Sequence, residues 1–484
     1  MSGVKSSALY SGSVPMGQKV AFGIGMLANQ MFPAALGIFM VVLVQGLGFP
    51  PWLWGIIFFV PRLFDAITDP IMGFISDNTR SKWGRRRQYV FLGAVITGLS
   101  FILMWQLHIE KGIVYNFIYF MIFSFTFYLG LTIFSIPYVA MGYEMSNDYH
   151  ERTRVMAVAQ WIGQWAWVIA PWFWVVIYSP DWFDSPAAGS RQLAVWVGLF
   201  CLILALVPAI FVKSRPTADE KDYEELNLKN IKKSLKSIFK SFKEAFSNIP
   251  FRRLCIATFL VFNSFNTIAA FSFFIIVHYT FGGDHGAAHP WPTLHGMVGA
   301  LCTTFITIPI VTKVSQRIGK RKTFVISQSI SIVGYILFWW CLRPGISPYW
   351  ILLPLPLFSF GIGGLFTLMM SMTADVCDLD ELNSGLRREG IFGAIYWWMV
   401  KFGLAFAGLS SGMIMSLVGF NQDSSVQTHT ALTGLRIFYS GLPILGTIIA
   451  IAIMWKYDLS EKRANEIRVK LEERHSLQTE SVEA

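Results

Sequence analysis

Long uninterrupted runs of apolar residues are the feature of this chain that most restricts its fold. The segments 91–105 and 432–454 each hold an apolar stretch near or above the length that crosses a hydrocarbon core, which takes roughly 20 helical residues. Hydrophobic residues make up 54% of the chain and charged residues 14%, where soluble domains carry roughly 25% charge. The sequence therefore predicts an all-α membrane protein that crosses the bilayer many times.

Charged residues, glycines and prolines divide the apolar runs into twelve expected transmembrane spans. An even number of spans places both chain termini on the same side of the membrane. The expected spans are 20–48, 52–76, 88–107, 113–142, 155–180, 191–212, 253–281, 294–314, 323–342, 347–372, 390–417 and 432–456.

Basic residues gather in the loops on one side of these spans. Most of the 39 lysines and arginines lie on that side, chiefly in the loops 78–88 and 315–322 and in the central segment 229–243. Lysine and arginine are enriched in cytoplasmic loops of membrane proteins. We therefore expect a multi-pass protein of the cell's inner (plasma) membrane with both termini in the cytoplasm.

One loop pattern recurs at half the length of the chain. The segment 77–87 (DNTRSKWGRRR) follows the second expected span, and 315–322 (SQRIGKRK) follows the eighth. The recurrence indicates an internal repeat, and chance clustering of basic residues in cytoplasmic loops is the alternative explanation. Two six-helix halves joined by a cytoplasmic linker are the major facilitator architecture. The expected division is an N-terminal tail 1–19, a bundle 20–214, a linker 215–250, a second bundle 251–456 and a C-terminal tail 457–484.

The linker carries the pattern of a basic amphipathic helix. Its apolar residues recur every three or four positions, with lysines on the other face, which is typical of a helix that lies on a membrane surface. Anionic lipid of the inner leaflet is the expected partner, and a calmodulin-like protein is the alternative. The net charge of +10 is attributed to such lipid contacts and not to nucleic acid. The apolar residues are Ile231, Leu235, Ile238, Phe242 and Phe246.

Ionisable residues occur in the middle of the second expected span. Asp65 and Asp69 are four residues apart, so their carboxylates share one helix face. Two like charges in an apolar setting repel unless a cation lies between them or one is protonated. The pattern predicts a cation-coupling site. The alternative is a packing pair between Arg62 and Asp65, one turn apart, which would account for only one of the two acids.

A lysine occupies the eleventh expected span. Lys401 lies about ten residues inside that span, so we expect an interior partner and not a side chain that reaches to the surface. Arg436, near the start of the twelfth span, is close enough to the interface to reach it.

Five short motifs are distributed along nearly the whole chain: 64–70 (FDAITDP), 136–138 (IPY), 148–154 (DYHERTR), 374–378 (ADVCD) and 385–390 (GLRREG). Together they resemble the glycoside–pentoside–hexuronide cation symporters of the major facilitator superfamily. The resemblance implies a secondary transporter that couples a cation to a small sugar-like solute and works by alternating access.

The same resemblance implies roles for individual residues. Asp65 and Asp69 match the family's paired cation-site acids, and Thr132 matches its cation ligand on the fourth span. Lys401 matches the lysine near the cation site, and Arg62 matches the arginine at the outer end of the pathway. Na⁺ is the expected coupling ion, bound at Asp65 and Asp69, with H⁺ and Li⁺ as alternatives and no other cofactor.

The expected substrate pocket departs from the melibiose-carrying members of that family. Neutral residues replace charged sugar ligands there, and amide and hydroxyl groups can donate and accept hydrogen bonds with sugar hydroxyls. This predicts a neutral pocket and argues against a simple galactoside. Its expected residues are Asn29, Gln30, Ser135, Gln160 and Gln164.

Tryptophans lie beside these polar residues. Trp161 and Trp165 are one helical turn apart in the fifth span, and Trp397 lies in the eleventh. Their rings could stack on the apolar faces of a sugar. The alternative is the ordinary interfacial belt of tryptophans.

Charged residues follow the fourth and tenth spans on the cytoplasmic side. They are interpreted as ion pairs between the two halves that close one face of the carrier while the other opens. The expected gate residues are Glu144, Asp148, Arg154, Asp375 and Arg387.

The sequence offers no catalytic triad, metal-ligand cluster or phosphate-binding loop, so an enzyme is not expected. The first hypothesis is a Na⁺-coupled glycoside carrier that works as a monomer. The alternatives are a cation-coupled carrier of a lysolipid or other amphiphile, and a non-transporting sensor or assembly protein on the same scaffold.

Overall fold

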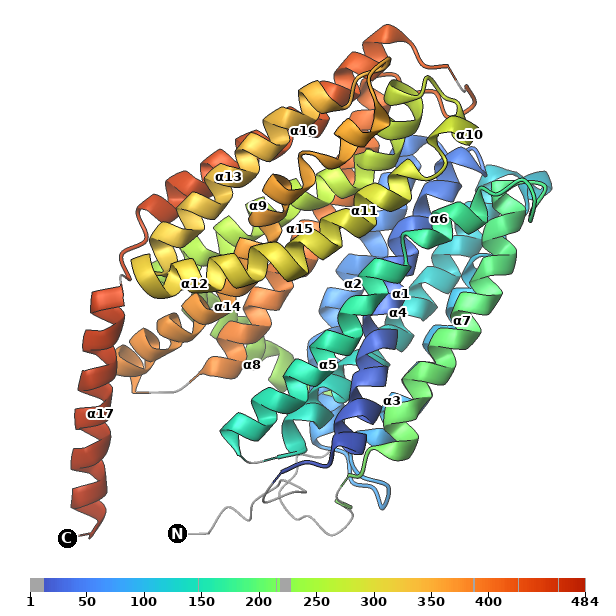
Figure 1. The fold of residues 1–484 in the computed structure, drawn as a ribbon. Helices are drawn as coiled ribbons and strands as arrows, with labels where there is room; N and C mark the ends of the chain where they lie inside the picture. The colour runs from blue at the N-terminus through green and yellow to red at the C-terminus, as the bar shows by residue number, and fades with distance from the viewer. Residues whose placement is uncertain are drawn as a thin grey trace. The chain divides into compact units, whose positions relative to one another are not determined.

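The computed structural model describes residues 13–146, 148–214, 216–217, 228–385, 388–424, 426–459 and 461–483. Over these residues the chain forms helices joined by turns, with no β-strand, and the predicted all-α fold is confirmed. The helices group into two compact units, Met1–Lys236 and Ser237–Ala484, coloured from blue to green and from green to red in Figure 1. The boundary falls inside the segment 215–250 that was expected as a linker.

The first unit has six helical stretches in its described part, one of them broken. A single 3₁₀ turn, Ile109–Lys111, precedes the fourth. The helices are α1 (Met16–Gln45), α2 (Pro51–Asp77), α3 (Arg87–Met104), α4 (Gly112–Glu144), α5 (Tyr149–Ile169) followed by α6 (Trp172–Ile177), and α7 (Pro186–Phe211).

The described part of the second unit has six stretches that are long and apolar enough to cross a membrane, and two further helices, Leu228–Ser247 and Glu461–Glu483. A π-helical segment, Ile275–Thr280, continues α9, and another, Cys302–Thr307, joins α11 to α12. The elements are α8 (Leu228–Ser247), α9 (Ile249–Phe274), α10 (His285–Ala288), α11 (Trp291–Leu301), α12 (Ile308–Ile318), α13 (Lys320–Cys341), a 3₁₀ turn (Pro348–Leu352), α14 (Leu355–Ser384), α15 (Glu389–Leu417), α16 (His429–Trp455) and α17 (Glu461–Glu483).

The two units use one packing scheme. In the first, α1 packs on α5 and α7, α3 packs on α4 and α7, and α2 packs on α4. In the second, α9 packs on α15 and α16, α13 packs on α14 and α16, and α12 packs on α14. Each helix thus has its counterpart at the same place in the other set of six. The half-length repeat predicted from the basic loops extends to the packing of the whole bundle.

A glycine permits a close approach of two helix backbones at the same place in each unit. A Cβ atom on Gly93 of α3 would lie 2.3 Å from the backbone nitrogen of Phe134 on α4. A Cβ atom on Gly334 of α13 would lie 2.6 Å from the backbone nitrogen of Phe358 on α14. Small residues let helix backbones approach closely in membrane bundles. Any larger residue at either position would push the two helices apart.

Ten helical segments in the described chain are long and apolar enough to cross a membrane. The two expected spans that fall short are the second and the fifth, which are α2 and α5. Charged side chains lower their hydropathy: α2 carries Arg62, Asp65 and Asp69, and the first turns of α5 carry Glu151 and Arg154. The packing scheme, in which both helices have counterparts, supports these two spans where hydropathy does not.

The fifth expected span, 155–180, is interrupted in the structure. The helix α5 ends at Ile169, and α6 begins at Trp172 with Pro171 as its N-cap. Proline lacks a backbone N–H and its ring clashes with the preceding turn, so it interrupts a helix.

The helix predicted in the linker is present as α8. The C-terminal part of its apolar face contacts protein and not lipid. Phe242 and Phe246 there pack against the core of the second unit. Their rings contact Trp398 and Phe251, with centroids 5.5 Å and 6.2 Å apart. Binding of this helix to anionic lipid stays a prediction, which now rests on its lysines.

The expected orientation predicts which loops react from outside the cell. Cysteines introduced at Asp284 and Asp423 should react with an impermeant thiol reagent added outside, and a cysteine at Ser81 should not. The five native cysteines are all buried, so the unmodified protein serves as a low-background control. Outside labelling at Ser81 would overturn the orientation.

Candidate functional site

A cluster of side-chain oxygens lies between α2 and α4. The Thr132 hydroxyl lies 2.8 Å from Asp65 Oδ1 and 3.2 Å from Asp69 Oδ1. Thr132 and Asp65 are buried, and Asp69 is half-buried. The structure therefore brings together the three residues that were expected to hold a cation.

A fourth oxygen belongs to this cluster and was missed in the sequence. The Thr68 hydroxyl lies 3.1 Å from the Thr132 hydroxyl and also donates to the backbone oxygen of Asp65 at 3.1 Å. Its position three residues after Asp65 places it on the same helix face, which was the available signal. We name Asp65, Thr68, Asp69 and Thr132 the oxygen cluster.

The oxygen cluster places two carboxylates beside the single hydroxyl of Thr132. Thr132 carries one hydroxyl hydrogen and therefore can donate to only one of the two carboxylates beside it. Two carboxylates this close repel each other, and a cation shared by the oxygens would offset that repulsion. Carboxylate and hydroxyl oxygens suit hard cations.

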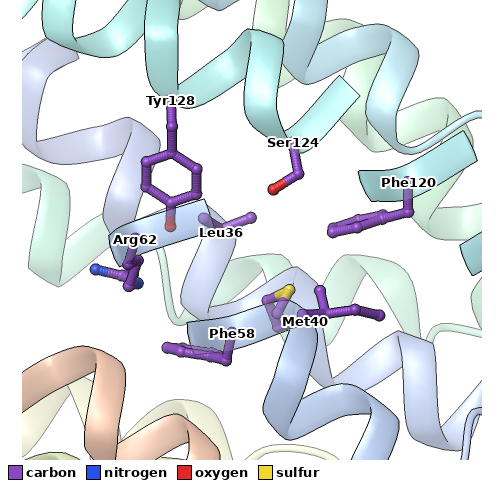
Figure 2. Close-up of a pocket in the computed structure, with 8 residues that line it drawn as sticks. Leu36, Met40, Phe58, Arg62, Phe120, Ser124 and Tyr128 are labelled. Atoms are coloured by element: carbon purple, nitrogen blue, oxygen red, sulfur yellow. The ribbon is translucent and has the colours of Figure 1, made fainter. Parts of the chain in front are cut away.

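Arg62 does not form the packing pair with Asp65 that was the alternative explanation of these charges. Its guanidinium carbon lies 5.1 Å from the ring centroid of Phe58 and 5.7 Å from that of Tyr128. Arg62 is 9% exposed, and its Nε has no hydrogen-bond partner among the described residues. It lines a small pocket between α1, α2 and α4 (Figure 2).

A neutral polar network joins α1 to α5 and contains two residues of the predicted pocket, Gln30 and Gln160. Gln30 Nε2 donates to Gln160 Oε1 at 2.7 Å. Trp167 Nε1 donates to Gln30 Oε1 at 3.0 Å, and Trp167 was not among the predicted ligands. The two glutamine amides thus keep further donors and acceptors for a ligand.

The network forms because a glycine lets α5 come close to α1. A Cβ atom on Gly163 would lie 2.7 Å from Met26 Cγ and 2.8 Å from Gln30 Nε2. Gln160 and Gln164 of α5 are exposed. A larger residue at position 163 would displace the glutamine that the network depends on.

The remaining predicted pocket residues are not in this network. Asn29 is half-buried on α1 and donates weakly to the Met26 sulfur at 3.9 Å. Ser135 is half-buried on α4, three residues after Thr132. Their part in substrate binding stays a prediction.

The predicted tryptophans are well exposed on their own units. Trp161 is 64% exposed and Trp165 44%, and their rings meet edge to face with centroids 6.2 Å apart. Trp397 on α15 is 47% exposed and tilts over Phe366. Exposure of this extent suits either a ligand surface or the interfacial belt, and both interpretations stand.

Lys401 lies half-buried on α15 in the second unit. The acids of the oxygen cluster belong to the first unit, so the predicted link between Lys401 and the cation site stays a prediction.

The predicted gate residues make ion pairs and hydrogen bonds within their own units. Glu144, at the end of α4, pairs with Arg85 and with Arg86 Nη1, the latter at 3.2 Å. Asp375 on α14 pairs with Lys320 at 2.6 Å. Each pair joins the basic loop of its unit to the fourth long helix, so the repeat extends to this contact.

The other gate residues have simpler partners. Asp148 caps α5 by accepting from the Glu151 backbone N–H at 2.7 Å, and Arg154 lies 3.3 Å from the Glu151 carboxylate. Arg387 lies outside the described residues. Pairing between the two halves remains a prediction.

Glu151 is a buried charge that the sequence reading did not single out. It pairs with Lys19 of α1 at 2.6 Å and accepts from the Val14 backbone N–H at 2.8 Å. The Lys19 contact, with help from Val14, lowers the pKa of Glu151 below its ordinary value. These two contacts of Glu151 hold the start of α1 against the first turn of α5.

Two helical units with one packing scheme, one of which holds paired acids and hydroxyls inside the bundle, are typical of a multi-pass membrane carrier of the major facilitator type. The model of the family described as MFS/sugar transport protein matches residues 21–461. This chain therefore belongs to that family.

Curated relatives cover nearly the full length of the chain at low identity. A glucuronide carrier protein homolog of Escherichia coli (strain K12) is 25% identical, over 96% of this chain and 97% of its own. A protein of the same organism, provisionally named a glycoside/cation symporter, is 24% identical, over 96% of this chain and 97% of its own. An isoprimeverose transporter of Lactiplantibacillus pentosus is 22% identical, over 97% of this chain and 94% of its own.

Solved structures agree on the fold. A bacterial homolog of the human lysosomal transporter Spinster, inward-facing and unoccupied, aligns with a TM-score of 0.67 at 14% identity, over 95% of this chain and 99% of its own. The nucleoside transporter NupG aligns with a TM-score of 0.62 at 17% identity, over 92% of this chain and 100% of its own. The matched family and these proteins are transporters, which confirms the expectation that the chain is not an enzyme.

The lowered pKa of Glu151 predicts a pH-dependent contribution to stability. The contribution is present above the ordinary carboxyl pKa of about 4.3 and is lost as the pH falls through the lower folded-state pKa. Glu151→Gln should therefore lower the unfolding temperature at pH 7, and the gap should close on acidification toward pH 3. The exposed Glu110→Gln is the control. A gap that is constant from pH 7 to 3 would contradict the assignment.

Proposed function

We propose that this protein is a symporter that couples the inward movement of a cation to the uptake of a glycoside or another sugar-like solute. The oxygen cluster on α2 and α4 is the observation that carries the proposal. Ionisable residues inside a membrane bundle are expensive and occur mainly where ions or substrates pass. The relatives named for glucuronide, glycoside and isoprimeverose support a sugar-like cargo.

Na⁺ is the proposed coupling ion, with H⁺ and Li⁺ as alternatives. Two carboxylates and two hydroxyls give an oxygen-only set of ligands, which a hard cation prefers. A proton on one carboxyl group would also remove the repulsion between Asp65 and Asp69. Experiments that vary sodium and pH separately decide between the two.

The mechanism follows from coupling between two ligands. When the cation is bound, repulsion between Asp65 and Asp69 is offset. By its resemblance to the family, Lys401 is proposed as the coupling lysine. If the cation and the substrate favour the same conformation, each must tighten binding of the other by the same factor.

Removing one acid should separate coupling from transport. Asp69→Asn keeps the side-chain shape but removes a charge, so it should abolish accumulation driven by a cation gradient and leave substrate exchange at least partly intact. Accumulation and exchange are measured in the same proteoliposomes. Asp181→Asn, at an exposed acid of the first unit, is the control.

Two results would count against this scheme in different ways. If Asp69→Asn still concentrates substrate under a sodium or proton gradient, the oxygen cluster is not the coupling site. If the unmodified protein responds to pH and not to sodium, the ion is H⁺ while the site stands.

The neutral network predicts recognition of hydroxyl groups. A hydrogen bond left unmade in a closed site costs about 1–3 kcal/mol, and about 1.4 kcal/mol is tenfold in affinity. Gln160→Leu should therefore weaken substrate binding by about tenfold or more. Cation binding measured alone should persist.

Two variants sharpen this experiment. Trp167→Phe removes the donor to Gln30 but keeps an aromatic ring, so its effect should be smaller. Gln192→Leu, at an exposed glutamine on α7, should have no effect. Unchanged affinity for every sugar in Gln160→Leu, together with binding of a lysolipid, would favour the amphiphile carrier instead.

A further inference from the structure

Two arginines lie at the end of the second unit where α13 ends and α16 begins. Arg343 follows the C-terminal turn of α13, and Arg436 lies near the start of α16. The guanidinium carbon of Arg436 lies 4.0 Å from the ring centroid of Trp339 and 4.3 Å from that of Tyr279, which belongs to the π-helical segment after α9. The guanidinium carbon of Arg343 lies 4.3 Å from the ring centroid of Trp340. Cation–π contacts thus hold two positive charges at this end of the unit.

These two guanidinium groups lack an acidic partner within the described residues. The Arg436 side chain makes one hydrogen bond there, from Nη2 to the Trp339 backbone oxygen at 2.8 Å, and the Arg343 side chain makes none. A guanidinium group has five N–H donors and stays charged. The two positive charges also repel each other. An anion between them would offset that repulsion and accept the remaining N–H donors.

The loops at this end of the second unit are poor in charge. The segments 282–293 and 418–431 contain no lysine or arginine, and their only acids are Asp284 and Asp423. Asp284 caps α10 by accepting from the Ala287 backbone N–H at 3.0 Å, and neither of these two described acids is in ion-pair contact with the arginines. The paired arginines are therefore not part of a general basic surface, such as the basic loop at the other end of the unit.

An exposed apolar surface extends from the arginines along α13 and α16, which pack against each other (Figure 1). On α13, Val333, Ile336 and Trp340 are each about half exposed and follow at spacings of three and four, so they share a helix face. Ile437 and Leu445 of α16 are exposed to a similar degree. Tryptophan and arginine at the end of an apolar stripe mark the depth at which lipid headgroups meet acyl chains. A cationic site at one end of such a stripe matches a phospholipid, whose phosphate lies beside its acyl chains.

We propose that Arg343 and Arg436 together bind the phosphate group of an anionic phospholipid whose acyl chains lie along the exposed face of α13. The planar fork of arginine matches phosphate oxygens with two parallel hydrogen bonds. Two guanidinium groups attract a headgroup with a net negative charge and repel the ammonium group of a zwitterionic lipid. In the expected orientation this end of the unit faces outward, so the site is separate from any contact of the α8 lysines with the inner leaflet. The site does not depend on the proposed function of the carrier.

An aromatic belt at the membrane interface is the simpler explanation of these tryptophans. A belt accounts for the exposed Trp340. It does not account for two arginines that are held together over aromatic rings without an acid, because separate arginines could each extend to water alone. Tyr279, Trp339 and Arg436 come from three helical segments, so a phosphate bound here would also join the ends of those segments.

Photocrosslinking tests the position and the headgroup of the lipid. The full-length protein is placed in phosphatidylcholine nanodiscs with a trace of phosphatidylglycerol that carries a diazirine next to its headgroup. Labelling of the segment 333–346 is then measured by mass spectrometry. A phosphatidylcholine with the same diazirine should label this segment about fivefold less, because it lacks the net charge that the arginines attract. Arg343→Gln combined with Arg436→Gln should lower labelling by phosphatidylglycerol to the level of phosphatidylcholine.

Two further double variants make the result specific. Arg343→Lys with Arg436→Lys keeps the charges but not the forks and should retain part of the preference. Arg252→Gln with Arg317→Gln removes two exposed arginines at the other end of the unit and should leave the preference unchanged. Equal labelling by the two lipids, or a preference that survives the loss of both Arg343 and Arg436, would overturn the proposal. If glycerol 3-phosphate displaces the label as well as unlabelled phosphatidylglycerol does at the same concentration, the occupant is a soluble phosphate and the lipid assignment is wrong.

Discussion

Carrying two carboxylates into the middle of an apolar helix bundle costs several kcal/mol by most estimates, and the contact between α2 and α4 is where this cost is offset. Thr132 must lie within hydrogen-bond distance of both Asp65 and Asp69. That position depends on how α4 is held, because α3 fixes α4 through the close approach of Gly93 to the Phe134 backbone. The chemistry of the candidate cation site thus depends on a packing contact that contains no polar side chain.

The repeat within the chain separates scaffold from function. Both units use the same helix pairing, the same glycine contact and the same ion pair between a basic loop and the fourth long helix. The paired acids have no such counterpart: the segment 291–318, which corresponds to α2 in the second unit, contains neither aspartate nor glutamate. A duplicated fold therefore carries a site that is not duplicated, which fits the general rule that function is added to folds locally.

The candidate site was partly readable in the sequence, because charge inside an apolar run is rare. Asp65, Asp69 and Arg62 stand out in this way. Thr68 and Trp167 do not, since threonine and tryptophan are common in membrane helices and only their contacts give them a role. Glu151 was passed over for a related reason: it lies in a charged loop motif, and its burial against Lys19 depends on a residue more than a hundred positions away.

The sequence by itself determined that the chain is an all-α membrane protein and that its second expected span holds a pair of acids. Hydropathy and helical spacing are local properties, so they can be read along the chain. The tertiary structure decided which side chains meet: that Thr132 joins both acids, that Gln30 bonds to Gln160, and that Arg62 turns to Phe58 and Tyr128 instead of Asp65. Contacts between distant helices depend on how their surfaces pack, and a charged residue that could pair one turn away can be held elsewhere by neighbours that only the folded bundle supplies.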